Sequence, residues 1–270
     1  TPSSGRWGSL FNFSVYVEDP ENDSVTCRLY INTTGEFIYK NSTTISTPGT
    51  CSIEVSDFSC LDMGNASFYW VVNDTFNLVN TSQPPYSITQ GPEIGKDEVS
   101  VFRIYPPDGT FVNRSGVNYL PLIIRVNDTT RGVTPSGVNV SFWITNDSLT
   151  YQQFFNLTNS SGYAVYYLEP DCTYTLGEQY WIGGTYDSCY EKVNATPTNF
   201  TFNVKGSITL TITQPKGEKY LRGDYPDGQN ITLRGYATPD CSADLSSATV
   251  YFIASQDSPT HPCEAVAEAN

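Results

Sequence analysis

Phe11-Asn12-Phe13-Ser14-Val15-Tyr16-Val17 alternates apolar and polar side chains over the length of one β-strand. Successive side chains of a strand point to opposite faces, so the odd positions would face a core and the even positions solvent. Residues 138–144 and 199–204 show the same alternation, and clusters of Gly, Pro, Asn and Asp separate such segments along the chain. The sequence therefore predicts an all-β protein.

Composition and charge exclude several classes of protein. Apolar residues make up 39% of the 270 residues and aromatic residues 14%, which is enough for packed cores and excludes disorder throughout. With 28 acidic and 14 basic residues the net charge is −14, so we expect no binding to the phosphate backbone of nucleic acids. No apolar run approaches the roughly 18 residues of a membrane span, so none is expected in this segment.

Short motifs recur at a nearly constant distance in the later part of the chain. Pro107-Asp108-Gly109 returns as Pro215-Lys216-Gly217, 108 positions later, and Arg125 returns as Arg234, 109 positions later. A repeat of roughly 100 residues has the size of an immunoglobulin-like β-sandwich, whose strands bury one face each. We therefore predict tandem immunoglobulin-like β-sandwich domains.

The repeat register and two Gly/Pro-containing linkers set the domain boundaries. We predict domains at residues 1–90, 97–205 and 207–270, with breaks near 91–97 and 205–207. In this register the first domain lacks its opening strand and the third stops before its last strands, so both end domains are expected to be incomplete. Either the chain continues beyond this segment, or a neighbouring chain supplies the missing strands by β-augmentation.

Most asparagine residues of the chain begin an N-glycosylation triplet. Sixteen of the 20 Asn residues begin an N-x-S/T triplet without proline in the middle, about four times the number expected by chance. Such an excess predicts a densely N-glycosylated, exported protein, and Asn12, Asn139 and Asn199 would lie on outward strand faces. The predicted glycosylation sites are Asn12, Asn22, Asn32, Asn41, Asn65, Asn73, Asn80, Asn113, Asn127, Asn139, Asn146, Asn156, Asn159, Asn194, Asn199 and Asn230.

The seven cysteines indicate an oxidising compartment. None forms a CxxC pair, and the one histidine, His261, stands alone beside Pro262, so the clusters that hold zinc are missing. Disulfides are the expected alternative. We predict a Cys172–Cys189 bond, because it would close a short, glycine-containing loop. The pairing of the others stays open: Cys27, Cys51, Cys60, Cys241 and Cys263.

Two segments carry a family resemblance. Residues 17–25, with Asp19-Pro20-Glu21-Asn22-Asp23 at their centre, resemble the strand–DPxxD–strand segment of cadherin-like and PKD-like extracellular domains. Residues 136–140 followed by 159–164 resemble invasin-like (bacterial Ig-like) repeats. Strings of such modules, rich in sequons and tyrosine, are similar to archaeal surface-layer glycoproteins and other archaeal surface or filament proteins. The resemblance implies an extracellular location at the cell surface.

Acidic residues raise the question of a metal. The cadherin-like family binds calcium through acidic residues near this segment, so the resemblance implies calcium ligands at Asp19, Glu21 and Asp23. The alternative is a solvated turn, which Asp-Pro and Asn-Asp favour without any ion. A second acidic pair, Asp97 and Glu98, stands at the first domain junction and is a candidate for an interdomain ion. No other cofactor is expected.

The sequence offers no catalytic constellation. The one histidine, His261, precedes Pro262 in a turn-like stretch, whereas a catalytic histidine usually lies in a cleft built by ordered strands. No glycine-rich phosphate cradle or favoured carboxylate pair is present either, so we expect a protein that is not an enzyme. We expect a structural glycoprotein, an S-layer or extracellular filament subunit that acts as a glycan-coated spacer, with copies of itself or other envelope proteins as partners. The alternatives are an adhesin or carbohydrate-binding module, which exposed aromatics would suit, and the accessory domains of a secreted enzyme.

Overall fold

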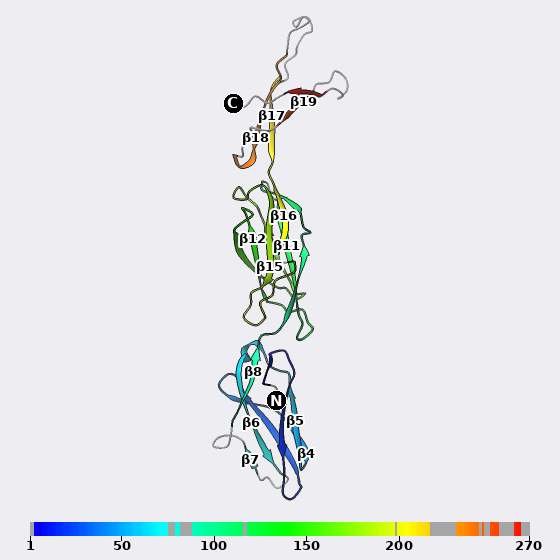
Figure 1. Cartoon of the computed structure of the whole chain (residues 1–270), viewed down its shortest axis with the longest axis vertical. Helices are drawn as coiled ribbons and strands as arrows, with labels where there is room; N and C mark the ends of the chain where they lie inside the picture. Colours follow the sequence, from blue (N-terminus) through cyan, green and yellow to red (C-terminus); the bar gives the residue numbers. More distant parts are fainter. Residues whose placement is uncertain are drawn as a thin grey trace.

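The protein is described here by a computed structural model, in which three groups of strands follow one another along the long axis (Figure 1). The structure describes residues 3–74, 79–81, 88–115, 118–197, 199–216, 231–242, 245, 249–253 and 262–265. Over these residues the chain is almost entirely β, and the helical elements are the single turns η1 (Cys60–Asp62) and η3 (Asp240–Ser242). The predicted all-β class of packed sheets is confirmed.

The first unit is a sandwich of a large and a small sheet. Its strands are β1 (Ser4–Arg6), β2 (Phe11–Val17), β3 (Ser24–Asn32), β4 (Phe37–Ser46), β5 (Gly49–Val55), β6 (Gly64–Asn73), β7 (Val79–Thr81) and β8 (Thr89–Gly95). The large sheet has the order β1-β8-β6-β3-β4, with β7 on β6, and the small sheet pairs β2 with β5. Phe11 and Phe13 are buried as the alternation predicts, and the Phe13 ring meets Phe68 of the large sheet edge-on at 5.0 Å.

The opening strand that we expected to be missing is present. β1 pairs in parallel with β8, with Gly5 opposite Ile94. Its three residues show no alternation, and one is glycine, which weakens a strand, so no sequence pattern marked it. Gly5 has a packing reason, because a Cβ at this position would lie 2.6 Å from Cζ of Phe11. The ring of Phe11 thus covers the backbone of β1.

The second unit is also a two-layer sandwich. Its strands are β9 (Val99–Tyr105), β10 (Thr110–Asn113), β11 (Leu120–Asp128), β12 (Asn139–Thr145), β13 (Tyr151–Leu157), β14 (Tyr163–Leu168), β15 (Gly177–Thr185) and β16 (Phe200–Lys205). One sheet has the order β10-β16-β15-β12-β13 and the other β14-β11-β9. Side chains of both sheets fill the core, among them Trp181, Phe142 and Ile124, each less than 2% exposed. β15 occupies the middle of the larger sheet.

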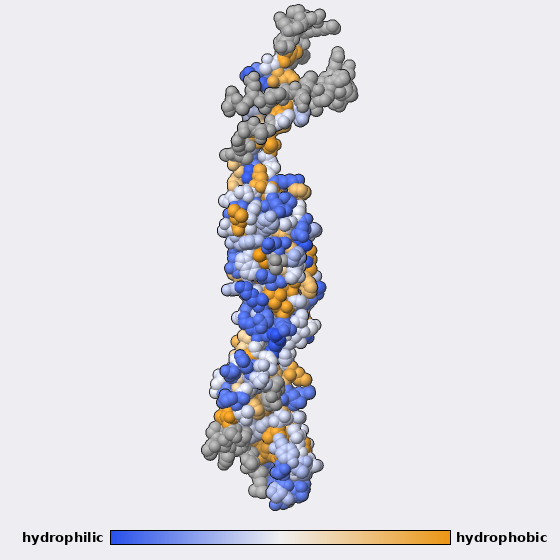
Figure 2. Space-filling model, viewed as in Figure 1, coloured by the Kyte–Doolittle hydropathy of each residue, from blue (hydrophilic) through white to orange (hydrophobic). Residues whose placement is uncertain are grey.

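The third unit contributes two short pairs of strands. β17 (Ile208–Gln214) pairs with β18 (Arg234–Pro239), and β19 (Val250–Ile253) pairs with β20 (Pro262–Ala265). Large apolar side chains of these strands stay exposed, with Leu210 and Ile212 each at 66%. Figure 2 shows such apolar residues along this part of the surface. His261 and Asn230 lie outside the described residues.

The sheets of one unit end and those of the next unit begin at two places in the chain. The first change lies between β8, which ends at Gly95, and β9, which begins at Val99. The second lies between β16 and β17, at residues 206–207. The large sheet of the first unit therefore extends beyond the boundary that we placed at residue 90. Within the described residues, no sheet pairs strands across either junction.

Candidate functional site at the interdomain junctions

Among the described residues three disulfides are formed, and two of them join neighbouring units. Cys27–Cys51 links the two sheets of the first unit, Cys60–Cys189 links the first unit to the second, and Cys172–Cys241 links the second to the third. The side chain of Cys263, in β20, lies outside what the structure describes.

The predicted Cys172–Cys189 bond is wrong. These cysteines flank β15, and a nine-residue strand holds its ends about 26 Å apart, whereas a disulfide allows a Cα separation of about 7 Å at most. The glycines that suggested a bend, Gly183 and Gly184, lie within the strand. A Cβ at Gly184 would lie 2.7 Å from the carbonyl oxygen of Val193, so the missing side chain serves packing.

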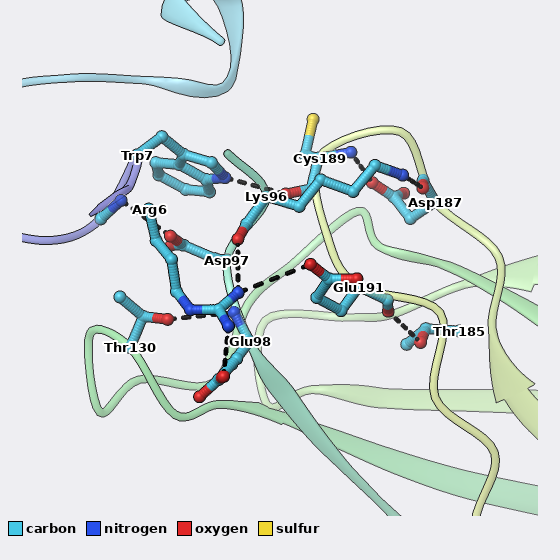
Figure 3. A network of polar contacts seen from close by, with 11 residues as sticks. Arg6, Trp7, Lys96, Asp97, Glu98, Thr130, Thr185, Asp187, Cys189 and Glu191 are labelled. Atoms are coloured by element: carbon cyan, nitrogen blue, oxygen red, sulfur yellow. Dashed lines mark hydrogen bonds and ion pairs between the residues drawn. The ribbon is translucent and has the colours of Figure 1, made fainter. Parts of the chain in front are cut away.

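At the first junction, Trp7 of the segment after β1 lies against the loop of the second unit that carries Cys189 (Figure 3). Trp7 is 8% exposed, and its indole Nε1 donates a hydrogen bond to the carbonyl oxygen of Cys189 at 2.8 Å. Its ring meets that of Tyr190 edge-on, with the centroids 5.8 Å apart. Because Cys189 is bonded to Cys60, the tryptophan packs directly beside the disulfide that joins the units.

The Arg131 side chain packs against the Trp7 ring and binds several polar groups next to it. The Arg131 guanidinium lies 4.1 Å from the centre of the Trp7 ring and pairs with Asp128 at 2.7 Å and with Asp97 at 3.3 Å. Its Nη2 also donates to the Tyr190 hydroxyl at 2.8 Å. Both carboxylates have fully buried side chains. Buried charges require such partners, and a cation over an indole face adds attraction.

Asp97 hydrogen-bonds to the backbone of both neighbouring segments, at Gly8 and at Cys189. Its Oδ1 accepts a hydrogen bond from the backbone N–H of Gly8 at 2.8 Å, and its backbone nitrogen donates to the Cys189 carbonyl at 3.2 Å. Burial raises the pKa of Asp97, and the neighbouring Asp128 carboxylate raises it further, while the Gly8 N–H and Arg131 act in the opposite direction. Where we considered an interdomain ion, the structure places the cation of Arg131.

The rim of this junction is more exposed. Arg6 pairs with Glu98 and, at 3.6 Å, with Glu191, and its Nη1 donates to the carbonyl oxygen of Lys96 at 2.8 Å. The Arg6 side chain is 33% exposed and the two glutamates more so, which limits the stability such pairs contribute. Arg6 nevertheless holds the linker in place, because it binds the backbone carbonyl oxygen of Lys96 and the side-chain carboxylate of Glu98.

The second junction uses the same kinds of contact. Arg114, directly after β10, pairs with both carboxylate oxygens of Asp240, at 3.0 Å and 3.3 Å. The two side chains are 7% and 10% exposed, and the hydrogen bond from Arg114 is the largest cause that lowers the pKa of Asp240. Asp240 stands next to Cys241, so the ion pair adjoins the disulfide to Cys172.

The two junctions are built from equivalent positions. Arg6 ends β1 and Arg114 follows β10, and both strands pair in parallel with the last strand of their own unit. These arginines are 108 positions apart, and Cys60 and Cys172 are 112 apart, close to the repeat length. In each case the arginine and the cysteine of one unit reach an acidic residue and a cysteine of the next. We call this arrangement the junction clamp.

The acidic turn at Asp19 is a hydrogen-bonded turn. Asp19 Oδ1 accepts from the backbone nitrogens of Glu21 at 2.9 Å and Asp23 at 3.2 Å, so its carboxylate is engaged by the turn itself. Among the described residues, no three His, Cys, Asp or Glu side chains gather where they could hold a metal ion. The structure therefore does not bring Asp19, Glu21 and Asp23 together as a calcium site.

Most predicted glycosylation sites lie at the surface. The exposed ones are Asn12, Asn22, Asn41, Asn65, Asn113, Asn156, Asn159, Asn194 and Asn199. The half-buried ones are Asn32, Asn73, Asn127, Asn139 and Asn146. Asn12 and Asn199 are outward as expected, whereas Asn139 is partly covered. The side chain of Asn80 and all of Asn230 lie outside the description.

Comparisons with known proteins give a distant likeness only. No family model and no curated protein matches the chain. The fibronectin(III)-like modules of Clostridium thermocellum CbhA match at 15% identity and a TM-score of 0.31, over 75% of this chain and 89% of theirs. A tetra-tandem repeat from the extending region of a large adhesion protein matches at 12% and 0.39, over 76% and 52%. A 1.5-MDa bacterial ice-binding adhesin matches at 16% and 0.30, over 78% and 66%.

These values support no statement about function. The matches span about half to two thirds of the two adhesin chains, and all TM-scores lie below one half. Within the described residues, no helix has the length and apolar character needed to cross a membrane.

Proposed function

We propose that this chain is part of a non-enzymatic, extracellular surface glycoprotein in which Ig-like units, stacked end to end, act as a stiff spacer. The observation that carries the proposal is the junction clamp at both unit boundaries. Neighbouring domains joined by a short linker and a small interface are expected to move relative to one another. Here each boundary combines a covalent bond with polar contacts between the units. At the first boundary these are the hydrogen bonds from Trp7 to Cys189 and from Gly8 to Asp97, and at the second the buried Arg114–Asp240 ion pair.

The same features support the extracellular location. The three disulfides among the described residues fit oxidising surroundings, as outside the cell, because such bonds are rare in cytosolic proteins. Sixteen sequons in 270 residues add to this, and nine of the asparagines are exposed, so a glycan would not disturb the packing. In its finer form the proposal is an S-layer or filament subunit that contacts copies of itself or other envelope proteins.

The alternative of a carbohydrate-binding module has weaker support. The aromatic side chains on the outer face of the first unit contact one another across strands: Tyr30 stacks on Tyr69 at 4.9 Å, and Phe37 meets Tyr69 edge-on at 4.8 Å. Cross-strand pairs of this kind stabilise a sheet. The rings of Tyr30, Phe37 and Tyr69 are thus engaged with one another in the sheet, which favours the spacer over a sugar-stacking platform at this place.

Immunogold electron microscopy with an antibody against the second unit tests the proposal. We expect label on the outer face of intact cells and on isolated envelopes or filaments, together with an intact mass above that of the bare 29.9 kDa polypeptide. Label confined to the cell interior, or a bare polypeptide mass, would refute the surface-glycoprotein function.

A further inference from the structure

The two disulfides between units are interlaced along the chain. The four cysteines follow in the order Cys60, Cys172, Cys189 and Cys241, and the bonds join the first to the third and the second to the fourth. A covalent path therefore leads from Cys60 across to Cys189, back along the chain to Cys172, and across to Cys241. This path contains about 17 residues, whereas the chain from Cys60 to Cys241 contains about 181.

The short path is the central strand of the second unit. Residues 172–189 contain β15, which pairs antiparallel with β12 on one side and with β16 on the other. Cys189 lies at the junction with the first unit and Cys172 at the junction with the third. Trp181 and Gln179 anchor the strand in the core, each with 0% exposure. One buried strand thus runs from one clamp to the other.

We propose that β15 and its two disulfides form a covalent tie that bears tension along the chain and keeps the second unit from being pulled apart. The inference rests on the proposed spacer function for its biological use, but its mechanical content does not depend on where the protein resides.

The lengths of the covalent paths decide which of them bears the force. A fully extended chain spans about 3.5 Å per residue, so about 17 residues allow roughly 60 Å. The nine residues of β15 already rise about 3.3 Å each, and only the turns beside the strand have slack. The other arms between the clamps, residues 61–171 and 190–240, are several times longer. When the ends are pulled, the short path becomes taut first and the other strands of the unit carry little of the force.

Single-molecule stretching of the whole chain, held by its two ends, measures this directly. We choose a Cys263→Ser background so that no thiol outside the three bonds takes part. In the oxidised chain the segment from Cys60 to Cys241 is expected to reach roughly 60 Å at high force, and after reduction roughly 630 Å. Because the readout is a maximum length, it holds even for variants whose units fail to fold.

Two double variants give an ordered series. Removal of the second clamp bond by Cys172→Ser with Cys241→Ser leaves a path of about 52 residues, or roughly 180 Å. Removal of the first by Cys60→Ser with Cys189→Ser leaves about 112 residues, or roughly 390 Å. As a matched control, Cys27→Ser with Cys51→Ser removes a disulfide outside the path. It should add the same roughly 80 Å in each background.

The outcomes separate the two proposals. The order of 60, 180, 390 and 630 Å supports the tie, while an oxidised chain that extends as far as the reduced chain overturns it, as does a reversed order of the two double variants. Failure of this series leaves the stiff spacer intact, because the buried contacts of the junctions would still hold the units. Label inside the cell refutes the spacer and leaves the measured tie unaffected.

Discussion

Gly8→Ala tests whether the first unit is seated on the second as the structure shows. A Cβ at residue 8 would lie 2.5 Å from Cγ and 2.8 Å from Cδ of Arg131, and closer still to Oδ2 of Asp97. Ordinary carbon–carbon contacts begin near 3.5 Å, so these side chains have to retreat by about 1 Å. They are held by Asp128 and by the Gly8 N–H, so the retreat breaks contacts of the junction.

The expected cost follows from overpacking in a well-packed site. Insertion of one carbon there costs about 1–3 kcal/mol. If the two clamped units unfold together, each kcal/mol lowers the melting temperature by about 2–4 °C. Calorimetry measures the transition, and 15N relaxation of the backbone amides measures whether the first two units still tumble as one body. We expect a lower melting temperature and faster, separate tumbling.

Gly95→Ala is the matched control for this experiment. It lies in β8 beside the same junction, and a Cβ there would meet the carbonyl oxygen of Gly5 at 3.5 Å, an ordinary contact. Replacement of glycine by alanine at such a site is neutral or stabilises by about 0.4–1 kcal/mol. If Gly8→Ala behaves like Gly95→Ala in both measurements, the reasoning about the first junction is refuted.

Three further predictions concern charge and glycans. Burial raises the pKa of Asp97, so the folded state binds its proton more readily than the unfolded state, and the contribution of Asp97 to stability should rise as the pH falls from neutral to about 4. Carboxylates with a lowered pKa, such as Asp240, act in the opposite direction, so the quantity to measure is the difference in free energy of unfolding between the native chain and Asp97→Asn. In pH-dependent urea unfolding this difference should shift in favour of the native chain as the pH falls, and a shift the other way would contradict the prediction. Arg114→Met leaves the Asp240 carboxylate without its cation and should lower the free energy of unfolding by about 1–3 kcal/mol, measured by thermal unfolding. Arg114→Lys should recover part of this loss. Equal melting temperatures for the native chain and both variants would count against the second clamp. Asn12→Gln should lower the intact mass by one glycan and leave the melting temperature almost unchanged, whereas an unchanged glycan mass would show that this site is empty.

The strands were predictable because their pattern is local. Alternation at residues 11–17 identified β2 and its buried face, and the same holds for Phe200 and Phe202 in β16. The opening strand β1 could not be recognised, because three residues that include Gly5 carry no period. A parallel pairing with β8 depends on residues almost 90 positions away.

The junctions could be predicted only in part. Their location in the linkers followed from composition, but the disulfide pairing did not. Cys172 and Cys189 are close in sequence, yet the extended strand β15 lies between them and holds them too far apart to bond. One signal was present in the sequence: Arg6 and Arg114 occupy equivalent repeat positions. It becomes meaningful only when β1 and β10 are known to pair with the last strands of their units. Trp7 and Arg131 meet through the fold alone.

Peptide mapping of the native, non-reduced protein by mass spectrometry tests the central claim most directly. The junction clamps require peptides that contain Cys60 joined to Cys189 and Cys172 joined to Cys241. Both linked pairs should be recovered, and both should disappear on reduction. A peptide in which Cys172 is joined to Cys189, or free thiols at these positions, would contradict the clamps and the covalent tie through β15.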